Sequence, residues 1–247
     1  MTATTPPPPP TASIVVPTYR EAANLPELVE RIAAAMAGAG LPYELIIVDD
    51  ASGDGTAAVV RRAAAAGHPV RLLERTTERG LSSAVAAGFR AARGDVLVCL
   101  DADLSHPPER IPDLLREVRE RGAEFAIGSR YVPGGSTAEA WGPFRRLNSR
   151  AATLLARPFT RARDPMAGFF ALPRRVFAAA SPWLDPVGYK IGLELLVKGN
   201  CRRVVEVPIH FAERQRGQSK LSLREQLNYL RHLYKLARFR LRHRRPR

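Results

Sequence analysis

The sequence has little cysteine and no long apolar run. Only two of its 247 residues are cysteine, Cys99 and Cys201, and they form neither a CxxC pair nor a Cys/His spacing. This argues against a disulfide framework and a structural zinc site, and it favours buried thiols in a reducing cytoplasm. Because no 18 consecutive residues are apolar, no membrane-spanning helix is predicted. Residues 1–11 contain five consecutive prolines and resemble no signal peptide, so an extended, solvated leader is expected.

Two common nucleotide-binding glycine motifs are also missing. Gly53-x-Gly55 begins like a dinucleotide-binding loop, but the position of the third glycine is Ala58. No GxxxxGK[ST] sequence occurs, so the chain has no P-loop. A nucleotide site, if present, must be built in another way.

Positive charge is plentiful but uneven. The net charge is +14, and residues 214–247 contribute +11 of it, with twelve Lys or Arg against one Glu. The preceding 213 residues therefore form a body that is close to neutral. Such a basic tail indicates an anionic partner: a membrane surface, nucleic acid or a phosphorylated ligand.

Short β-branched runs alternate with amphipathic segments through the first half of the chain. Strands are predicted at 12–17, 43–48, 70–73, 95–100 and 124–129, and helices at 21–36, 56–66, 81–92 and 107–121. Further on, helices are expected at 145–156, 191–198 and 222–240, and strands at 168–172 and 204–208. This alternation predicts an α/β fold with a mostly parallel sheet and helices on both faces. We expect one domain over 12–221, followed by a basic amphipathic helix and tail over 222–247.

Polar residues follow several of the predicted strands. Asp49 and Asp50 end the second strand, Asp101 and Asp103 follow the fourth, and Arg130 follows the fifth. In parallel sheets, ligands bind beyond the carboxyl ends of the strands. These side chains are therefore expected on one rim, which is the candidate site.

Asp101-Ala-Asp103 places two carboxylates one residue apart just past an apolar strand. They repel each other unless a cation lies between them, and Mg²⁺ favours one or two carboxylates together with substrate phosphates. The alternative is a turn with a helix-capping aspartate before Pro107. Asp50 similarly is either a partner for a ribose or base, or an ordinary residue at the start of a loop.

Four cations lie in or beside glycine-rich loops: Arg130, Arg145, Arg214 and Lys220. Diphosphates and acceptor phosphates require such donors, and arginine can bind two oxygens at once. In a chain with 38 Lys and Arg, a solvated surface position is the alternative for each of them.

Six motifs in order carry a family resemblance. They are VPTYREAANL (16–25), IIVDDASGDGT (46–56), RTTERGLSSAVAAG (75–88), LDADLSHPPE (100–109), GSRY (128–131) and GQSKL (217–221). Together they resemble the family 2 glycosyltransferases of GT-A fold, and in particular the dolichol- or polyprenol-phosphate mannose synthase group. DPMAGFF (164–170) is similar to the DPMSGFF sequence of prokaryotic members. The resemblance covers roughly residues 12–225.

The resemblance implies roles for individual residues. The nucleotide pocket would be lined by Pro17, Tyr19, Glu21, Val48 and Asp50, with Ala102 at the ribose. Asp101 and Asp103 would hold Mg²⁺ or Mn²⁺, and Ser105 replaces a glutamine sometimes found near the metal. Arg130, Arg145, Arg214 and Lys220 would bind the diphosphate and the lipid phosphate. The catalytic set would be Asp103, Arg130, Arg214 and Lys220.

The implied reaction transfers a hexose, with inversion, from a nucleotide-sugar to polyprenyl phosphate. GDP-mannose is the favoured donor, and UDP-glucose or a UDP-aminosugar is the alternative. A phosphate acceptor is already ionised near pH 7 and needs no general base, so His106, before two prolines, is expected to be a turn residue. A nucleic-acid-binding protein is disfavoured because the rim is acidic and no nucleic-acid module is present. The intact motifs argue against a non-catalytic sugar-nucleotide-binding subunit.

The last predicted helix interleaves leucines with Arg224, Arg231, Lys235, Arg238 and Arg242. A basic amphipathic helix can lie on an anionic membrane, although its leucines can instead pack on the catalytic core. The membrane interpretation places the protein in the cytoplasm, peripheral on the inner face of the cell membrane, with or without a separate membrane-anchoring subunit.

Overall fold

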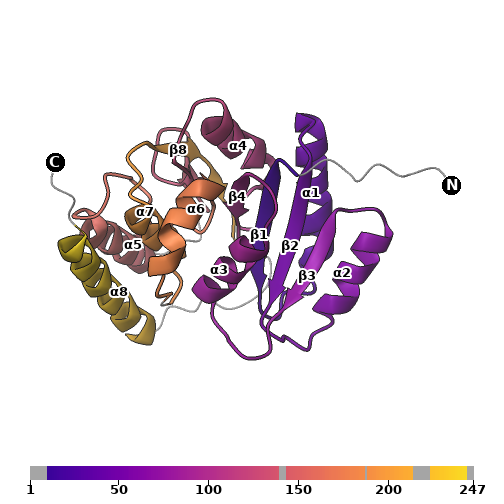
Figure 1. Cartoon of the computed structure of the whole chain (residues 1–247), viewed down its shortest axis with the longest axis horizontal. Coiled ribbons are helices and arrows are strands. Elements are labelled where there is room, and N and C mark those ends of the chain that lie inside the picture. Colours follow the sequence, from indigo (N-terminus) through magenta and orange to yellow (C-terminus); the bar gives the residue numbers. More distant parts are fainter. Residues whose placement is uncertain (1–9, 139–142, 187, 214–222, 244–247) are drawn as a thin grey trace.

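The computed structural model describes residues 10–138, 143–186, 188–213 and 223–243 (Figure 1). A seven-stranded sheet forms its centre, with strand order β3-β2-β1-β4-β7-β5-β8. The strands are β1 (Ala12–Thr18), β2 (Tyr43–Asp49), β3 (Val70–Glu74), β4 (Val96–Cys99), β5 (Phe125–Ser129), β7 (Phe170–Pro173) and β8 (Val204–Pro208). All pairings are parallel except those of β7, which is antiparallel to β4 and β5. The predicted α/β class and mostly parallel sheet are confirmed.

Helices cover both faces of this sheet. They are α1 (Leu25–Ala39), α2 (Thr56–Ala65), α3 (Leu81–Ala91), the 3₁₀ turn η1 (Pro108–Arg110), α4 (Ile111–Arg119), α5 (Pro143–Ala156), α6 (Arg174–Ala180), the 3₁₀ turn η2 (Ser181–Trp183), α7 (Ile191–Lys198) and α8 (Leu223–Arg242). Side chains of α1, α2 and α4 join one hydrophobic cluster, and those of α3, α6 and α7 join the other. The short α6 was not predicted, because seven residues carry too little periodicity.

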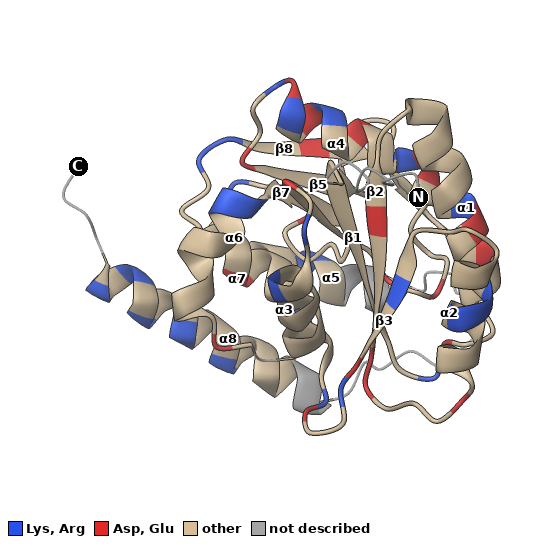
Figure 2. Ribbon diagram, turned by 45° about the vertical axis from the view of Figure 1, so that its right-hand side comes forward, with Lys and Arg blue, Asp and Glu red and all other residues tan. Residues whose placement is uncertain are grey.

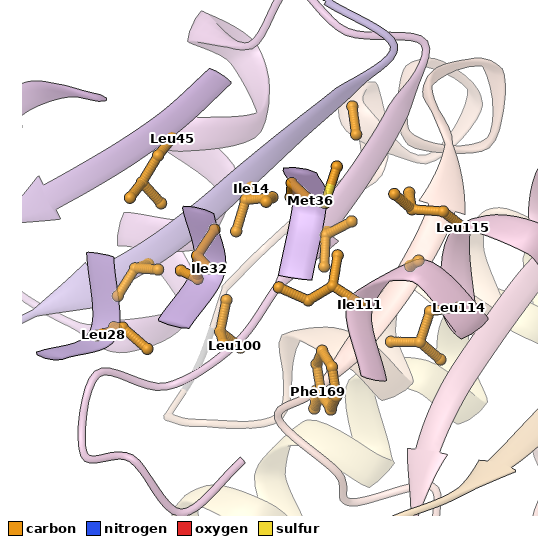
Figure 3. Packing of buried hydrophobic residues seen from close by; sticks show 14 of the residues in the cluster. Ile14, Leu28, Ile32, Met36, Leu45, Leu100, Ile111, Leu114, Leu115 and Phe169 are labelled. Atoms are coloured by element: carbon orange, nitrogen blue, oxygen red, sulfur yellow. The ribbon is translucent and has the colours of Figure 1, made fainter. Parts of the chain in front are cut away.

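The alternation of side chains along β1 explains the two clusters. Ile14 and Val16 point to one face, whereas Val15 between them points to the other. Figure 3 shows the first face, where Ile14 lies among leucine and isoleucine side chains of α1 and α4. Burial on both faces requires a continuous apolar strand, which is the pattern that the sequence shows.

The first helix begins later than the sequence pattern predicted. It was expected from residue 21, but α1 begins at Leu25. Pro26 has no backbone N–H to donate, so it is tolerated in the first turn of a helix and disrupts its interior. Residues 21–24 instead form a turn in which the Asn24 side chain donates to the Glu21 carboxylate at 2.7 Å.

A two-stranded parallel ribbon lies outside the main sheet. It pairs β6 (Ser136–Thr137) with β9 (His210–Phe211). The segment 131–142 was predicted as loop only, and the pairing of β6 depends on a partner more than seventy residues away. The ribbon brings Phe211 to the rim at which β4 and β5 end.

The two cysteines are free thiols. Cys99 is buried, as predicted, while Cys201 is only partly buried. Burial raises the pKa of Cys99 well above its usual value and raises that of Cys201 to about 12. Both thiols are therefore protonated at neutral pH and are poor nucleophiles.

The last helix, α8, packs against the body through part of its surface. Leu236 is fully buried in the second cluster, and the Tyr229 hydroxyl donates to the Ala152 carbonyl of α5 at 2.6 Å. In the part of the chain that the structure describes, no helix is both long enough and apolar enough to cross a bilayer.

Candidate active site

One cavity of about 970 Å³ lies beyond the carboxyl ends of β1, β2 and β4. Its first wall, here called the carboxylate wall, is formed by Glu21, Asp50, Asp101 and Asp103. The opposite wall, the leucine wall, comprises Ala151, Ala152 and Leu155 of α5 with Tyr229 and Leu230 of α8. The volume suits a ligand the size of a nucleotide-sugar.

Eight of the residues predicted for the site line this cavity: Pro17, Tyr19, Glu21, Asp50, Asp101, Ala102, Asp103 and Arg130. Val48 does not, because its side chain is fully buried in the second hydrophobic cluster. Arg145 belongs to α5, but its side chain is not among those described. Arg214 and Lys220 lie outside the described residues.

The chain bends sharply where it leaves the strands. Arg20, Ala51 and Leu104 follow β1, β2 and β4, and all three have left-handed backbone angles, with φ of 61°, 49° and 61°. A residue other than glycine pays roughly 1–3 kcal/mol for such a conformation, which persists only where its surroundings hold it. The backbone N–H of Arg20, for example, donates to the Ser52 hydroxyl at 2.8 Å.

Asp50 is the best-anchored carboxylate of the wall. Its Oδ1 accepts the Nε–H of Arg75 at 2.7 Å, and its Oδ2 accepts the backbone N–H of Gly80 at 2.7 Å. The same guanidinium donates to the Ser83 hydroxyl at 3.0 Å. Both members of the ion pair are buried, with side-chain exposures of 7% for Asp50 and 8% for Arg75. Asp50 therefore fixes the 75–83 loop at the edge of the cavity.

Arg75 was not predicted as a site residue. It opens the RTTERGLSS motif, and its place directly after a strand of the sheet was the available signal. The motif was recognised, but the sequence does not show that its first residue pairs with Asp50.

Asp101 and Asp103 follow β4 on one turn and face the cavity. Asp103 is nearly buried, and its Oδ1 accepts the backbone N–H of Ser105 at 3.1 Å. Among the described residues, no group of three or more His, Cys, Asp or Glu side chains could hold a metal ion. A cation between Asp101 and Asp103 would be held by carboxylate oxygens, and these donors suit Mg²⁺ or Mn²⁺. Ser105, at the position of the family's glutamine, is fully buried.

Arg130 is paired across the rim with Asp164 of the DPMAGFF motif. Its Nε and Nη2 donate to the two oxygens of Asp164 at 2.8 and 2.7 Å, and its backbone N–H donates to the same carboxylate at 3.0 Å. Burial disfavours the charged guanidinium, but the hydrogen bonds and charge of Asp164 raise the pKa of Arg130 above its usual value. Arg130 is thus a permanent cation in a fixed orientation that also lines the cavity.

Apolar side chains remain exposed beside the leucine wall. Among the residues that the structure describes, the exposed large hydrophobic side chains are Leu154, Leu155, Trp183, Tyr189, Leu227, Leu230, Tyr234 and Leu241. They belong to α5, α8 and the region of η2 that precedes α7. Figure 2 shows that lysine and arginine residues recur along α8 as well. Clustered exposed apolar residues mark an interaction surface.

Comparison with known proteins gives the family. Residues 13–179 match Glycosyl transferase family 2. Dolichol-phosphate mannosyltransferase of Pyrococcus furiosus is 46% identical over 231 residues, which are 92% of this chain and 64% of that protein, slightly less than two thirds of its length. The protein of the same name from Saccharomyces cerevisiae is 42% identical, covering 91% of this chain and 86% of its own. Polyprenol monophosphomannose synthase of Mycolicibacterium smegmatis is 41% identical, with 85% and 80% covered.

Two solved structures share the fold at lower identity. Mannosyl-3-phosphoglycerate synthase from Rubrobacter xylanophilus is 22% identical and superposes with a TM-score of 0.66, covering 96% of this chain and 78% of its own. Glucosyl-3-phosphoglycerate synthase from Mycobacterium tuberculosis, in complex with Mn²⁺, UDP and its product, is 22% identical with a TM-score of 0.64, covering 94% and 80%. The predicted GT-A fold is confirmed. With its strand-end carboxylates and more than half of its length matched, this chain belongs to glycosyl transferase family 2, in the dolichol- or polyprenol-phosphate mannose synthase group that its motifs predicted.

Proposed function

We propose that this protein transfers mannose from GDP-mannose to polyprenyl phosphate at a membrane surface. The observation that carries the proposal is the cavity that joins the carboxylate wall to the leucine wall. A nucleotide-sugar is polar and anionic, which suits the carboxylate wall with a bound cation. Polyprenyl phosphate combines an anionic phosphate with an apolar chain, and the apolar chain suits the leucine wall. The names of the relatives support the same pairing of substrates.

The carboxylate wall is proposed as the donor side. Tyr19, Glu21 and Asp50 would surround the nucleoside, and Asp101 with Asp103 would hold Mg²⁺ or Mn²⁺ beside its diphosphate. The Mycobacterium tuberculosis enzyme, which has the same fold and was solved in complex with Mn²⁺ and UDP, supports a divalent ion as the cofactor. When bound, such an ion neutralises the charge that develops on the leaving diphosphate.

The acceptor needs little activation. The second pKa of a phosphate monoester is about 6, so at neutral pH an acceptor oxygen is already an anion and can attack the anomeric carbon directly. One attack on the face opposite the leaving group inverts the configuration. The residues then act by positioning and charge stabilisation, with Arg130, Arg145, Arg214 and Lys220 proposed as partners of the two phosphate groups.

The leucine wall is proposed as the route by which the lipid enters. Leu155 and Leu230 line the cavity, and Leu154 and Leu227 are exposed on the same helices. The exposed Arg231, Arg238 and Arg242 of α8 would face anionic headgroups, each contributing about 1 kcal/mol near the surface. We therefore propose peripheral binding at the inner face of the cell membrane, alone or with a separate membrane-anchoring subunit.

The direct test is product formation on vesicles that contain a polyprenyl phosphate. Purified protein would receive GDP-mannose, UDP-glucose or UDP-N-acetylglucosamine in separate reactions. Lipid-linked mannose from GDP-mannose alone, lost on addition of EDTA, is the expected result. Transfer only from a UDP-sugar would contradict GDP-mannose as the donor. Transfer to water-soluble phosphates but not to the lipid would contradict polyprenyl phosphate as the acceptor.

The carboxylate assignment has its own matched pair of variants. Asp103→Asn should lower turnover at least 100-fold while the melting temperature changes little, because it removes a charge facing the cavity. Asp113→Asn makes the same change on the exposed surface of α4, where Asp113 pairs with Arg110 and Arg116, and should leave turnover unchanged. Full activity of Asp103→Asn would contradict the proposal that Asp103 binds the metal ion.

A further inference from the structure

His106 lies three residues after Asp103, in the turn between β4 and η1. It was predicted to be a turn residue, but its side chain is almost completely buried and reaches the cavity. Its Nδ1 accepts the backbone N–H of Asp101 at 3.3 Å. The same Nδ1 lies 3.7 Å from Oδ2 of the Asp101 carboxylate. The imidazole therefore contacts both the backbone and the side chain of Asp101.

Aromatic rings hold this imidazole from two elements. Phe169 lies at 5.5 Å between ring centroids, and Phe211 of β9 meets the imidazole edge-on at 5.1 Å. The backbone N–H of Ala212 donates to the Ser105 carbonyl at 3.0 Å, which ties the end of β9 to the same turn. The ring of His106 is thus clamped where the β4 turn, the start of β7 and the end of β9 meet.

Gly168 completes the slot beside the ring. A Cβ atom placed on Gly168 would lie 3.0 Å from Oδ2 of Asp101 and 3.3 Å from Cε1 of His106. The Asp101 carboxylate and the imidazole therefore lie side by side against a residue that has no side chain. Any displacement of the ring changes the space available to the carboxylate.

We propose that His106 is a positioning residue for Asp101: it holds the backbone and carboxylate of Asp101 in the orientation that binds a divalent cation. The inference rests on the proposed metal site and goes beyond the carboxylate motif itself. His106 acts through Asp101, because its Nδ1 is engaged with the backbone of that residue. Residues in such supporting contacts typically change metal affinity by 10–100-fold when they are replaced.

Two substitutions separate positioning from simple packing. His106→Asn leaves an amide oxygen close to the place of Nδ1, so the Asp101 N–H keeps an acceptor, although the smaller side chain leaves a cavity. His106→Leu keeps more of the volume and removes the acceptor. Packing alone predicts that the Asn variant is at least as damaged as the Leu variant, whereas positioning predicts that only the Leu variant loses cation affinity.

The affinity for Mn²⁺ is measured in the presence of GDP, with electron paramagnetic resonance as the readout of bound Mn²⁺. Thermal denaturation of each variant reports its stability. We expect His106→Leu to bind Mn²⁺ 10–100-fold more weakly and His106→Asn to stay within about threefold of the native protein. His68→Asn and His68→Leu, at a surface histidine that contacts Glu30, serve as matched controls and should not change binding. Gly168→Ala, which crowds the Asp101 carboxylate directly, should also weaken binding.

Three outcomes would overturn the inference. They are native affinity in His106→Leu, equal losses in the Asn and Leu variants, or no Mn²⁺ binding by the native protein with GDP. A native protein that binds Mn²⁺ with GDP but transfers no mannose would contradict the proposed function only. In that case the ranking of the His106 variants still decides whether His106 positions Asp101.

Discussion

The two walls of the cavity are held in different ways. On the carboxylate wall, Asp50 receives hydrogen bonds from Arg75 and Gly80. Asp49, the preceding residue at the end of β2, accepts from the Thr18 hydroxyl at 2.9 Å and from the backbone and hydroxyl of Ser52. The ends of β1 and β2 are thus tied to neighbouring loops by charged or polar contacts. The side chains are thereby fixed before a ligand arrives.

The helices that carry the leucine wall are held by polar contacts that side chains other than the leucines make. The Tyr229 hydroxyl bonds to α5, Lys235 pairs with Asp185 at 2.5 Å, and the Arg240 guanidinium donates to the carbonyls of Pro158 and Phe159. These contacts anchor α8 to α5 and to the segments beside it. Leu154, Leu155, Leu227 and Leu230 on the same two helices remain exposed.

The difference matches the chemistry of the two proposed substrates. A sugar nucleotide is recognised by directional hydrogen bonds, which require rigid donors and acceptors. An isoprenoid chain offers none, so an apolar surface that excludes water is sufficient. Four variants test this contrast, and they follow in order of decreasing expected effect.

Arg75→Met should damage the carboxylate wall most. It leaves the buried Asp50 charge with one partner fewer, and such losses cost about 3 kcal/mol. For a chain of this length the melting temperature should fall by roughly 6–12 °C. The KM for the nucleotide-sugar should rise at least tenfold, because the 75–83 loop loses its anchor. Arg71→Met, four residues earlier on β3, is the control and should leave this KM unchanged.

Glu44→Gln tests the opposite end of the sheet. Although burial alone would raise its pKa, hydrogen bonds from Ser13 and the Arg93 backbone, together with Arg71, lower the pKa of the Glu44 carboxyl. The variant should lose about 2 kcal/mol of unfolding free energy at pH 7. Turnover at saturating substrate should not change, since Glu44 is remote from the cavity.

The pH dependence of that loss follows from the sign of the shift. A carboxyl with a lowered folded pKa contributes its full stabilisation above its unfolded pKa of about 4.3, and the contribution disappears as the pH falls through the folded value. Urea unfolding at several pH values should therefore show the native protein and Glu44→Gln converging in acid. A constant difference down to pH 3 would contradict the lowered pKa.

Leu154→Ser combined with Leu227→Ser tests the exposed apolar surface beside the leucine wall. The two side chains are 69% and 67% exposed, so unfolding free energy should change by less than about 0.5 kcal/mol. Affinity for anionic vesicles should nevertheless fall roughly tenfold, because burying leucine in a membrane contributes about 1.5–3 kcal/mol when complete. Flotation on anionic and neutral vesicles measures this, and unchanged binding would contradict the membrane role of this surface.

Lys235→Met should have the smallest effect. Its ion pair with Asp185 is partly exposed, and such pairs contribute only about 0.2–1 kcal/mol. Thermal denaturation should show a shift of at most a few degrees that shrinks in high salt. A larger loss would mean that α8 depends on this pair for its position.

Much of the fold could be predicted because its signals are local. The helix over 191–198 has the predicted bounds, and β1 and β2 extend one residue past the prediction. Asp50, Asp101 and Asp103 could be assigned to one rim because parallel strands all end there. The predicted start of α1 was wrong. The helical pattern was extended back to residue 21, but Pro26 lies in the first turn of the helix, so residues 21–24 stay outside it.

Contacts between distant segments could not be predicted in the same way. Nothing local in Phe170–Pro173 states that it pairs antiparallel between β4 and β5. Arg130 was expected to face phosphate, and its pairing with Asp164, 34 residues away, was not foreseen. His106 appeared to be a turn residue because the ring contact with Phe211 joins positions 105 residues apart.

Local signals in the sequence were enough to predict the order and kind of the elements, the carboxylates at the strand ends and the family. Periodicity, turn residues and contiguous motifs act over a few residues, so they are visible in one dimension. The pairing of polar groups across the rim, and the leucines with which α5 and α8 line the cavity, became visible in the folded chain alone. Both depend on packing between segments far apart in the chain, where burial makes an unpaired charge costly and selects its partner.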